Sequence, residues 1–217
     1  MKFLRDFFDR HEHHFKRNGK LEKLYPVYEM IDTFLYTPGE VTTSASHVRD
    51  GMDLKRMMSM VVVGLLPCIL MAMYNTGLQA NMTMTSMGLS AATTWQAGLI
   101  DILGIGFSPD SILSNFIHGA VYFFPLLIIS YGVGGIWETL FAVVRGHEIN
   151  EGFLVTGILF PLILPPMIPL WQAALGISFG VVIGKEIFGG VGKNFLNPAL
   201  TARAFLFFAY PGQISGD

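Results

Sequence analysis

The sequence has few charged residues, and these are unevenly placed. Only 14% of its 217 residues are charged and 52% are hydrophobic, whereas a soluble domain usually carries about 25% charged residues. Ten of the fourteen lysines and arginines precede Met57, and none lies between Met57 and Val144. This distribution excludes an ordinary soluble domain. It predicts a polar head at residues 1–56 followed by a membrane domain at residues 57–217.

The scarcity of cysteine, the small net charge and the lack of a complete histidine motif exclude further classes of protein. The single cysteine, Cys68, lies in an apolar run and leaves no disulfide framework or zinc cluster. The net charge of −2 indicates no nucleic-acid partner. The histidines at 11, 13 and 14 do not form a metalloprotease motif, because Phe15 stands where the second histidine of HExxH is required. We therefore expect no metal site in the head.

Apolar segments at about 57–73, 116–144, 153–167, 171–187 and 199–210 predict five membrane-spanning helices. When the spans alternate in direction, the basic residues that flank them all fall on one side of the membrane. By the positive-inside rule this side is the cytoplasm, which predicts a cytoplasmic N-terminus. The fold class is thus an all-α polytopic membrane protein. The third and fourth segments are short and interrupted by proline, as in the broken helices of transporter-like folds. Gly176, Gly180 and Gly184 recur at four-residue spacing and predict close helix packing.

Glu138 is an acid within the second apolar segment. It precedes Arg145 by seven residues, or about 10 Å along a helix, so it lies inside the bilayer, where an acid costs about 2.5–3.5 kcal/mol. Gly134 and Gly135 lie on its helical face and leave a shallow groove for a flat ring. The carboxylate suits a quinone oxygen, a proton or Na⁺. The alternative is an acid paired with Arg145 or a neighbouring helix, beside glycines that only allow close packing.

The glycine-rich loop at 189–198 resembles a nucleotide-binding loop but fails both motifs. Asn194 stands where a P-loop needs Ser or Thr, and Phe195 replaces the third glycine of the dinucleotide fingerprint. Backbone N–H groups, Asn194, Asn197 and the following helix with Arg203 still make a polar nest suited to a flavin ring, an ion or a small solute. The alternative is a connection whose own backbone groups are satisfied.

Four blocks of sequence resemble the B subunits of the Na⁺-translocating NADH:quinone reductases. They are SHVRDGMDLKRMM, GGIWETLFAVVRGHEINEGF, WQAALGISFGVVIGKEIFGG and GKNFLNPALTARAFLFFAYPGQISGD. The D subunit of Rnf-type complexes is less similar, because this chain has a long head. The resemblance implies the N-terminal half of the family protein, which is one half of a transporter-like inverted repeat.

The resemblance also implies a function. Such a protein is part of a six-subunit complex in the bacterial inner membrane that passes electrons from NADH through flavins to ubiquinone and exports Na⁺. Gly134, Gly135 and Glu138 match positions tied to the quinone site and Na⁺ uptake, and Glu29 matches a weaker candidate for ion entry. Asn194, Asn197 and Arg203 are the candidate flavin contacts.

The resemblance further implies FMN and riboflavin as cofactors. The threonine that carries covalent FMN is expected beyond Asp217, because Ser90-Ala91-Ala92-Thr93 lacks the leading aspartate of the family motif. From the residues alone, two other functions stay open. One is a solute or ion channel without a redox role, and the other is a scaffold for partner proteins.

Overall fold

The computed structural model describes residues 2–16, 19, 21–35, 54–88, 94–146, 149 and 152–214. This part of the chain is helical and contains no strand, which confirms the all-α class. The elements are α1 (Lys2–Phe15), η1 (Glu22–Leu24), α2 (Tyr25–Leu35), α3 (Leu54–Ser86), α4 (Trp95–Leu103), α5 (Ile112–Arg145), α6 (Gly152–Leu162), α7 (Leu170–Gly184), η2 (Glu186–Phe188), α8 (Pro198–Ala209) and α9 (Pro211–Ile214).

Three helices are long and apolar enough to cross a membrane, which confirms a polytopic membrane protein. They cover Met57–Ser86, Ile112–Arg145 and Leu170–Phe188, while α6 and α8 are shorter apolar helices. Helix α3 continues to Ser86, well past position 73, where the first apolar segment ends. The added turns are polar but contain no proline, and hydroxyl groups such as that of Thr83 bond back to the helix carbonyls. Hydropathy therefore locates the apolar part of α3 but does not show where the helix ends.

Helices α5 and α7 pack against each other and run in the same direction, and α6 packs on α5 in the opposite direction. Gly134 of α5 faces Ile177 of α7, and Arg145, further along α5, pairs with Glu186 just after α7. The Tyr131 hydroxyl on α5 donates to the Leu154 carbonyl oxygen near the start of α6, at 2.6 Å. Successive helices from α5 to α7 therefore alternate in direction.

The core lies among α5, α6, α7 and α8. The glycine stripe of α7 faces α8 as the sequence predicted: a Cβ atom on Gly180 would lie 2.3 Å from the carbonyl oxygen of Pro198. Gly176 and Gly184 face Leu206 and Thr201 in the same way. The buried cluster comprises Leu126, Phe153, Phe160, Leu164, Ile168, Ala173, Ile177, Val181, Ala199, Ala202, Leu206 and Ile214.

Helix α3 packs against the first half of α5 through a buried polar cluster. The Asn81 amide donates to Asn115 Oδ1 at 2.8 Å, and Asn81 Oδ1 lies 2.7 Å from His118 Nδ1. The two backbones approach closely beside it, because a Cβ on Gly77 or Gly119 would overlap the opposite backbone. Only 6% of the most apolar stretch of α3 is buried, against 50% for that of α7, so most of α3 faces outward.

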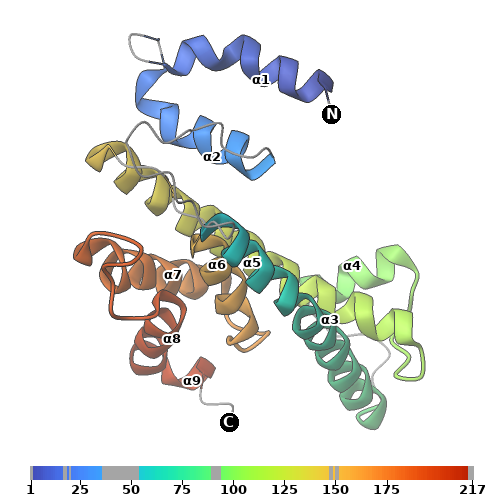
Figure 1. Cartoon of the computed structure of the whole chain (residues 1–217). Coiled ribbons are helices and arrows are strands. Elements are labelled where there is room, and N and C mark those ends of the chain that lie inside the picture. Colours follow the sequence, from blue (N-terminus) through green and yellow to red (C-terminus); the bar gives the residue numbers. More distant parts are fainter. Residues whose placement is uncertain are drawn as a thin grey trace.

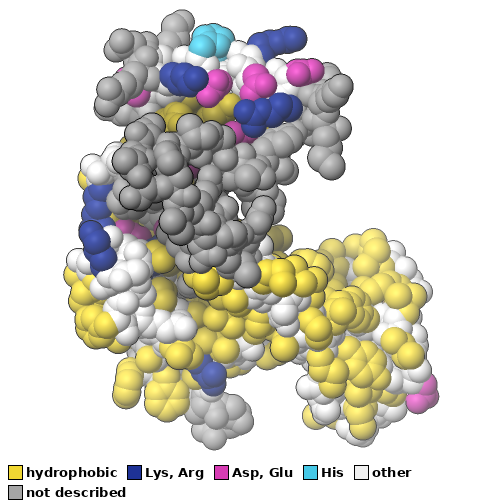
Figure 2. All heavy atoms as spheres, in the orientation of Figure 1, with side chains coloured by type: hydrophobic (Ala, Val, Ile, Leu, Met, Phe, Trp, Pro, Cys, Tyr) yellow, Lys and Arg dark blue, Asp and Glu magenta, His cyan; other side chains and the backbone are white. Residues whose placement is uncertain are grey.

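The head packs α1 against α2 above the end of α5 (Figure 1). Arg5 bridges to Asp32 at 2.9 Å, and the Tyr28 hydroxyl donates to the Phe8 carbonyl oxygen at 3.1 Å. Burial, together with the charge of Asp32, raises the pKa of Tyr28 to about 12. Figure 2 shows charged side chains gathered over α1 and α2 and a mostly hydrophobic surface over the membrane part.

Candidate functional site

A groove of about 620 Å³ runs along α5 beside the start of α6. Its walls are mainly apolar, and Glu138 is the one acid among the described lining residues. The full lining is Tyr131, Gly132, Gly135, Ile136, Glu138, Thr139, Leu140, Val143, Ile149, Phe153 and Leu154. An apolar cleft with a single ionisable group is a common form of binding site for a flat organic molecule.

The two glycines before Glu138 do different things. A Cβ on Gly134 would lie 2.5 Å from Cζ of Phe153, so this glycine allows α6 and α7 to pack closely against α5. A Cβ on Gly135 would meet only Cε1 of Phe153, at 3.9 Å, and this glycine lines the groove. The structure therefore joins Gly135 and Glu138 in one groove and assigns Gly134 to packing.

Glu138 is 4% exposed and begins a row of alternating charges. The Lys185 ammonium group, at the end of α7, contacts Glu138 Oε1 and also lies 3.3 Å from Glu186 Oε1. The other oxygen of Glu186, Oε2, accepts from Arg145 Nη1 at 3.1 Å. The side chains of Lys185 and Glu186 are 5% and 1% exposed, whereas that of Arg145 is 33% exposed. The row thus leads from the groove to the surface.

The ion pair of Glu138 with a neighbouring helix is one of the two arrangements that the sequence left open. Arg145, which the sequence also offered as a partner, pairs with Glu186. Sequence reasoning placed Lys185 and Glu186 at the end of a span and gave them no part in the site. Their signal was an adjacent base and acid at the end of an apolar segment, which is costly there unless both are paired. His147, close by in sequence, lies outside the described residues.

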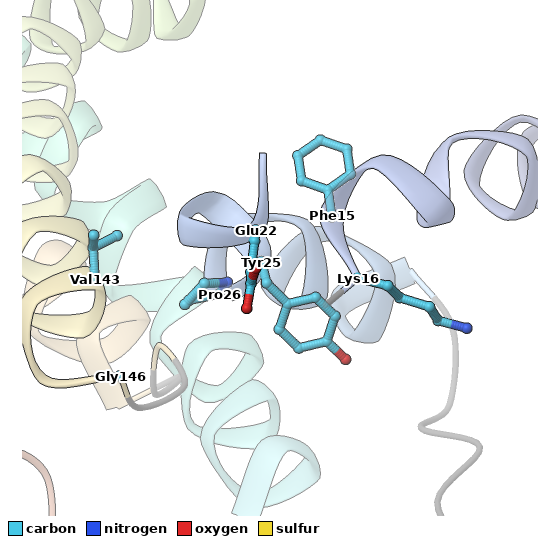
Figure 3. Close-up of a pocket in the computed structure, with 7 residues that line it drawn as sticks. All are labelled: Phe15, Lys16, Glu22, Tyr25, Pro26, Val143 and Gly146. Carbon is cyan, nitrogen blue, oxygen red and sulfur yellow. The ribbon is translucent and has the colours of Figure 1, made fainter. Parts of the chain in front are cut away.

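A second cavity, of about 790 Å³, separates the head from the end of α5. Figure 3 shows Pro26 and Glu22 on the side of the head that faces Val143, whereas Lys16 points away. Tyr25 and Gly146 complete the two sides of the cavity. Val143 lines both this cavity and the groove, so the two spaces adjoin at that residue.

Glu29, the other predicted ion-coupling residue, lies half-buried on α2. It is not among the described residues that line either cavity. Within the described residues no group of three or more His, Cys, Asp or Glu side chains is placed to hold a metal ion. The structure therefore brings Gly135 and Glu138 together and leaves Glu29 apart from them.

The predicted flavin contacts have local partners. Asn194 Nδ2 donates to the Leu196 carbonyl oxygen at 2.7 Å, and Asn197 Oδ1 caps α8 by accepting from the backbone N–H of Ala199 at 3.0 Å. Arg203 is exposed on α8. The loop backbone also bonds within itself, for instance from the Lys193 N–H to the Gly190 carbonyl oxygen at 3.3 Å. These residues fit a loop that satisfies its own hydrogen-bonding groups better than they fit a flavin-binding site. The segment Ser90–Thr93 lies outside the described residues.

The fold and this site define a polytopic helical membrane protein that keeps a row of paired charges beside an apolar groove. Residues 41–216 match the NQR2, RnfD, RnfE family, and the chain belongs to that family. The predicted likeness to the B subunits is thereby confirmed at the level of the family.

Several curated relatives share one name, which describes each as the B subunit of a Na(+)-translocating NADH-quinone reductase. The protein of Stutzerimonas stutzeri (strain A1501) is 60% identical over 216 residues, which cover 99% of this chain and 53% of the relative. That of Chromohalobacter salexigens is 57% identical over 214 residues, with 99% and 52% covered. That of Azotobacter vinelandii (strain DJ) is 56% identical over 216 residues, with 99% and 53% covered. The chain spans about half the length of these relatives.

Proposed function

We propose that this chain is part of the B subunit of a Na⁺-translocating NADH:quinone reductase and that the α5 groove receives the quinone head group. The proposal includes a bacterial inner membrane, a cytoplasmic head at residues 1–56 and ubiquinone as the substrate. It is supported by the shared name of relatives that are 56–60% identical over almost the whole chain. The electron transfer and the export of Na⁺ belong to the assembled complex.

The groove itself is the observation that carries the proposal. A quinone ring has two apolar faces and polar oxygens at its edge, and the groove offers apolar walls with one carboxylate. Gly135 keeps the α5 backbone open, because no side chain fills the space beside Phe153. A groove of about 620 Å³ lies within the range of about 300–1,000 Å³ usual for small-molecule sites.

Glu138 suits the reduced form of the substrate. An ionised carboxylate accepts hydrogen bonds and donates none. It therefore favours the hydroxyl group of a quinol over the carbonyl oxygen of a quinone. The Lys185 ammonium group contacts the Glu138 carboxylate and balances its negative charge. Stabilising the product in this way favours reduction of the bound ring.

FMN and riboflavin enter the proposal only at the level of the complex, where flavins supply one-electron transfer. The amide groups of Asn194 and Asn197 are used in local bonds, and this does not support a flavin contact there. No step is assigned to these residues. The chain contributes the groove, its carboxylate and the packing that holds both.

The test is a Gly135→Ala variant made in the full-length protein within the complex. We expect the added methyl group to narrow the groove, raise the KM for quinone and change the sensitivity to quinone-site inhibitors, at an unchanged amount of assembled complex. Gly98→Ala on α4 is the matched control, because a Cβ there meets nothing within 4 Å. Unchanged KM and inhibitor sensitivity in Gly135→Ala would refute a quinone site in this groove.

A further inference from the structure

Helix α4 has two apolar sides, and the packing of the described residues covers only one of them. Ala97 and Ile100 are 1% and 0% exposed, and α4 packs against α5. At about 100° of rotation per residue, Trp95, Leu99 and Ile102 lie on the opposite side of the helix. They are 55%, 42% and 82% exposed. A helix that is apolar on both sides needs a second apolar environment beside it.

The open side of α4 continues onto the neighbouring elements. Met87 after α3, Leu103 at the end of α4 and Ile112 at the start of α5 are exposed as well. Figure 2 shows hydrophobic side chains, and no lysine or arginine on the face shown, over the region where α3, α4 and the start of α5 meet in Figure 1. The sequence has no basic residue between Met57 and Val144. This surface therefore suits an apolar partner and offers no basic group to an anionic one.

The length of α3 places α4 at a membrane surface. The segment Met57–Ser86 has 30 residues, which make a helix about 45 Å long. A bilayer with its headgroup layers is about 40–45 Å thick, so α3 reaches from one surface to the other. The loop after α4 is held at the far end of α3, because Ser114 Oγ donates to the Gly106 carbonyl oxygen at 2.7 Å and lies 3.4 Å from the Asn81 amide nitrogen. Helix α4 therefore lies at the level of the lipid headgroups, where tryptophan is enriched.

We infer that α4 is an interfacial lipid-binding helix, which inserts Trp95, Leu99 and Ile102 among the acyl chains of phospholipids at the membrane surface far from the head. Such a helix lies in the plane of the interface with its apolar side in the lipid. The contact depends on apolar area and not on attraction between charges, because Asp101 is the only charged residue of α4. The inference goes beyond the proposed function and requires only the membrane location of the fold.

The test places a photoreactive p-benzoylphenylalanine at Ile102 of the full-length protein, in the assembled complex reconstituted into vesicles of radiolabelled phosphatidylcholine. Illumination should attach labelled lipid to this subunit. Leu70, which is 52% exposed in the middle of α3, is the reference for a lipid-facing position. Asp6, exposed on α1 in the head, is the reference for a position outside the lipid. We expect the yield of lipid adduct at Ile102 to approach that at Leu70 and to exceed that at Asp6 severalfold.

Attachment of the probe at Ile102 to another polypeptide would overturn the inference, because α4 would then be a protein-docking surface. A lipid yield no higher than at Asp6 would overturn it too, since the helix would face water. Vesicles of anionic phosphatidylglycerol should give the same yield, and adducts with that lipid alone would contradict a contact that is independent of charge. If the complex does not assemble with the probe at Ile102, the same probe at Trp95 decides, because it replaces one exposed aromatic side chain by another.

Discussion

The ring of Phe153 on α6 occupies the space in which a side chain on Gly134 of α5 would stand. The two residues belong to neighbouring helices that run in opposite directions, and the ring carbon Cζ lies 2.5 Å from the position of a Gly134 Cβ. Gly135, the next residue, has open space in the corresponding direction. The groove and the packing that forms its wall are thus built by adjacent glycines.

Gly134→Ala is expected to weaken the protein. Overpacking of a close-packed site costs about 1–3 kcal/mol, so less complex should assemble and its thermal unfolding should occur at a lower temperature. Phe153→Leu in the same chain should restore part of the loss, because it removes the ring that the new methyl group meets. Normal assembly and stability of the single variant would contradict this packing role.

Gly180→Ala should separate α7 from α8. The added Cβ would lie 2.3 Å from the backbone oxygen of Pro198, which moves only if α8 moves. We expect a loss of stability of about 1–3 kcal/mol, measured by denaturant titration of the full-length protein in detergent. Gly64→Ala on α3 is the control, because nothing lies within 4 Å of its Cβ. Equal stability of the two variants would argue against the close contact.

The polar contact between α3 and α5 should be measurable as a coupling energy. Asn81 and His118 are buried partners at 2.7 Å, and such interhelical bonds in membrane proteins are worth about 0.6–1.7 kcal/mol. A double-mutant cycle of Asn81→Ala and His118→Ala should return a coupling in that range. Met82→Ala, at an exposed position beside Asn81, should show no coupling to His118→Ala. Additive effects of the first pair would contradict the bond.

Variants of Asn197 can show whether this residue caps a helix or contacts a flavin. Its Oδ1 accepts from two backbone N–H groups of α8, and loss of such a cap costs about 0.5–2 kcal/mol. Asn197→Ala should therefore lower stability, whereas Asn197→Asp should retain it. Flavin per assembled complex, measured by absorbance, should be the same in both. A stable Asp variant with reduced flavin would show that the side chain contacts the cofactor.

The sequence predicted the features that depend on local pattern. Apolar length indicated the membrane helices, and four-residue spacing identified the Gly180 stripe as a packing face. The contact between Glu138 and Lys185 joins positions 47 residues apart, and only the packing of α7 on α5 brings them together. Gly134 and Gly135 could not be told apart, because adjacent helix positions differ by about 100° of rotation and the neighbouring helices decide which side is filled.

The end of helix α6 explains why prolines gather there. Eleven residues make a helix about 16 Å long, roughly half of the 30 Å hydrocarbon layer. Helix α6 is therefore too short to cross that layer before the chain turns. Proline has no N–H donor, and the carbonyl oxygens of Pro161, Pro165 and Pro169 accept bonds from Leu164, Ile168 and Gln172. The turn is thus a segment with few free donors, and its prolines supply acceptors for the N–H groups that follow them.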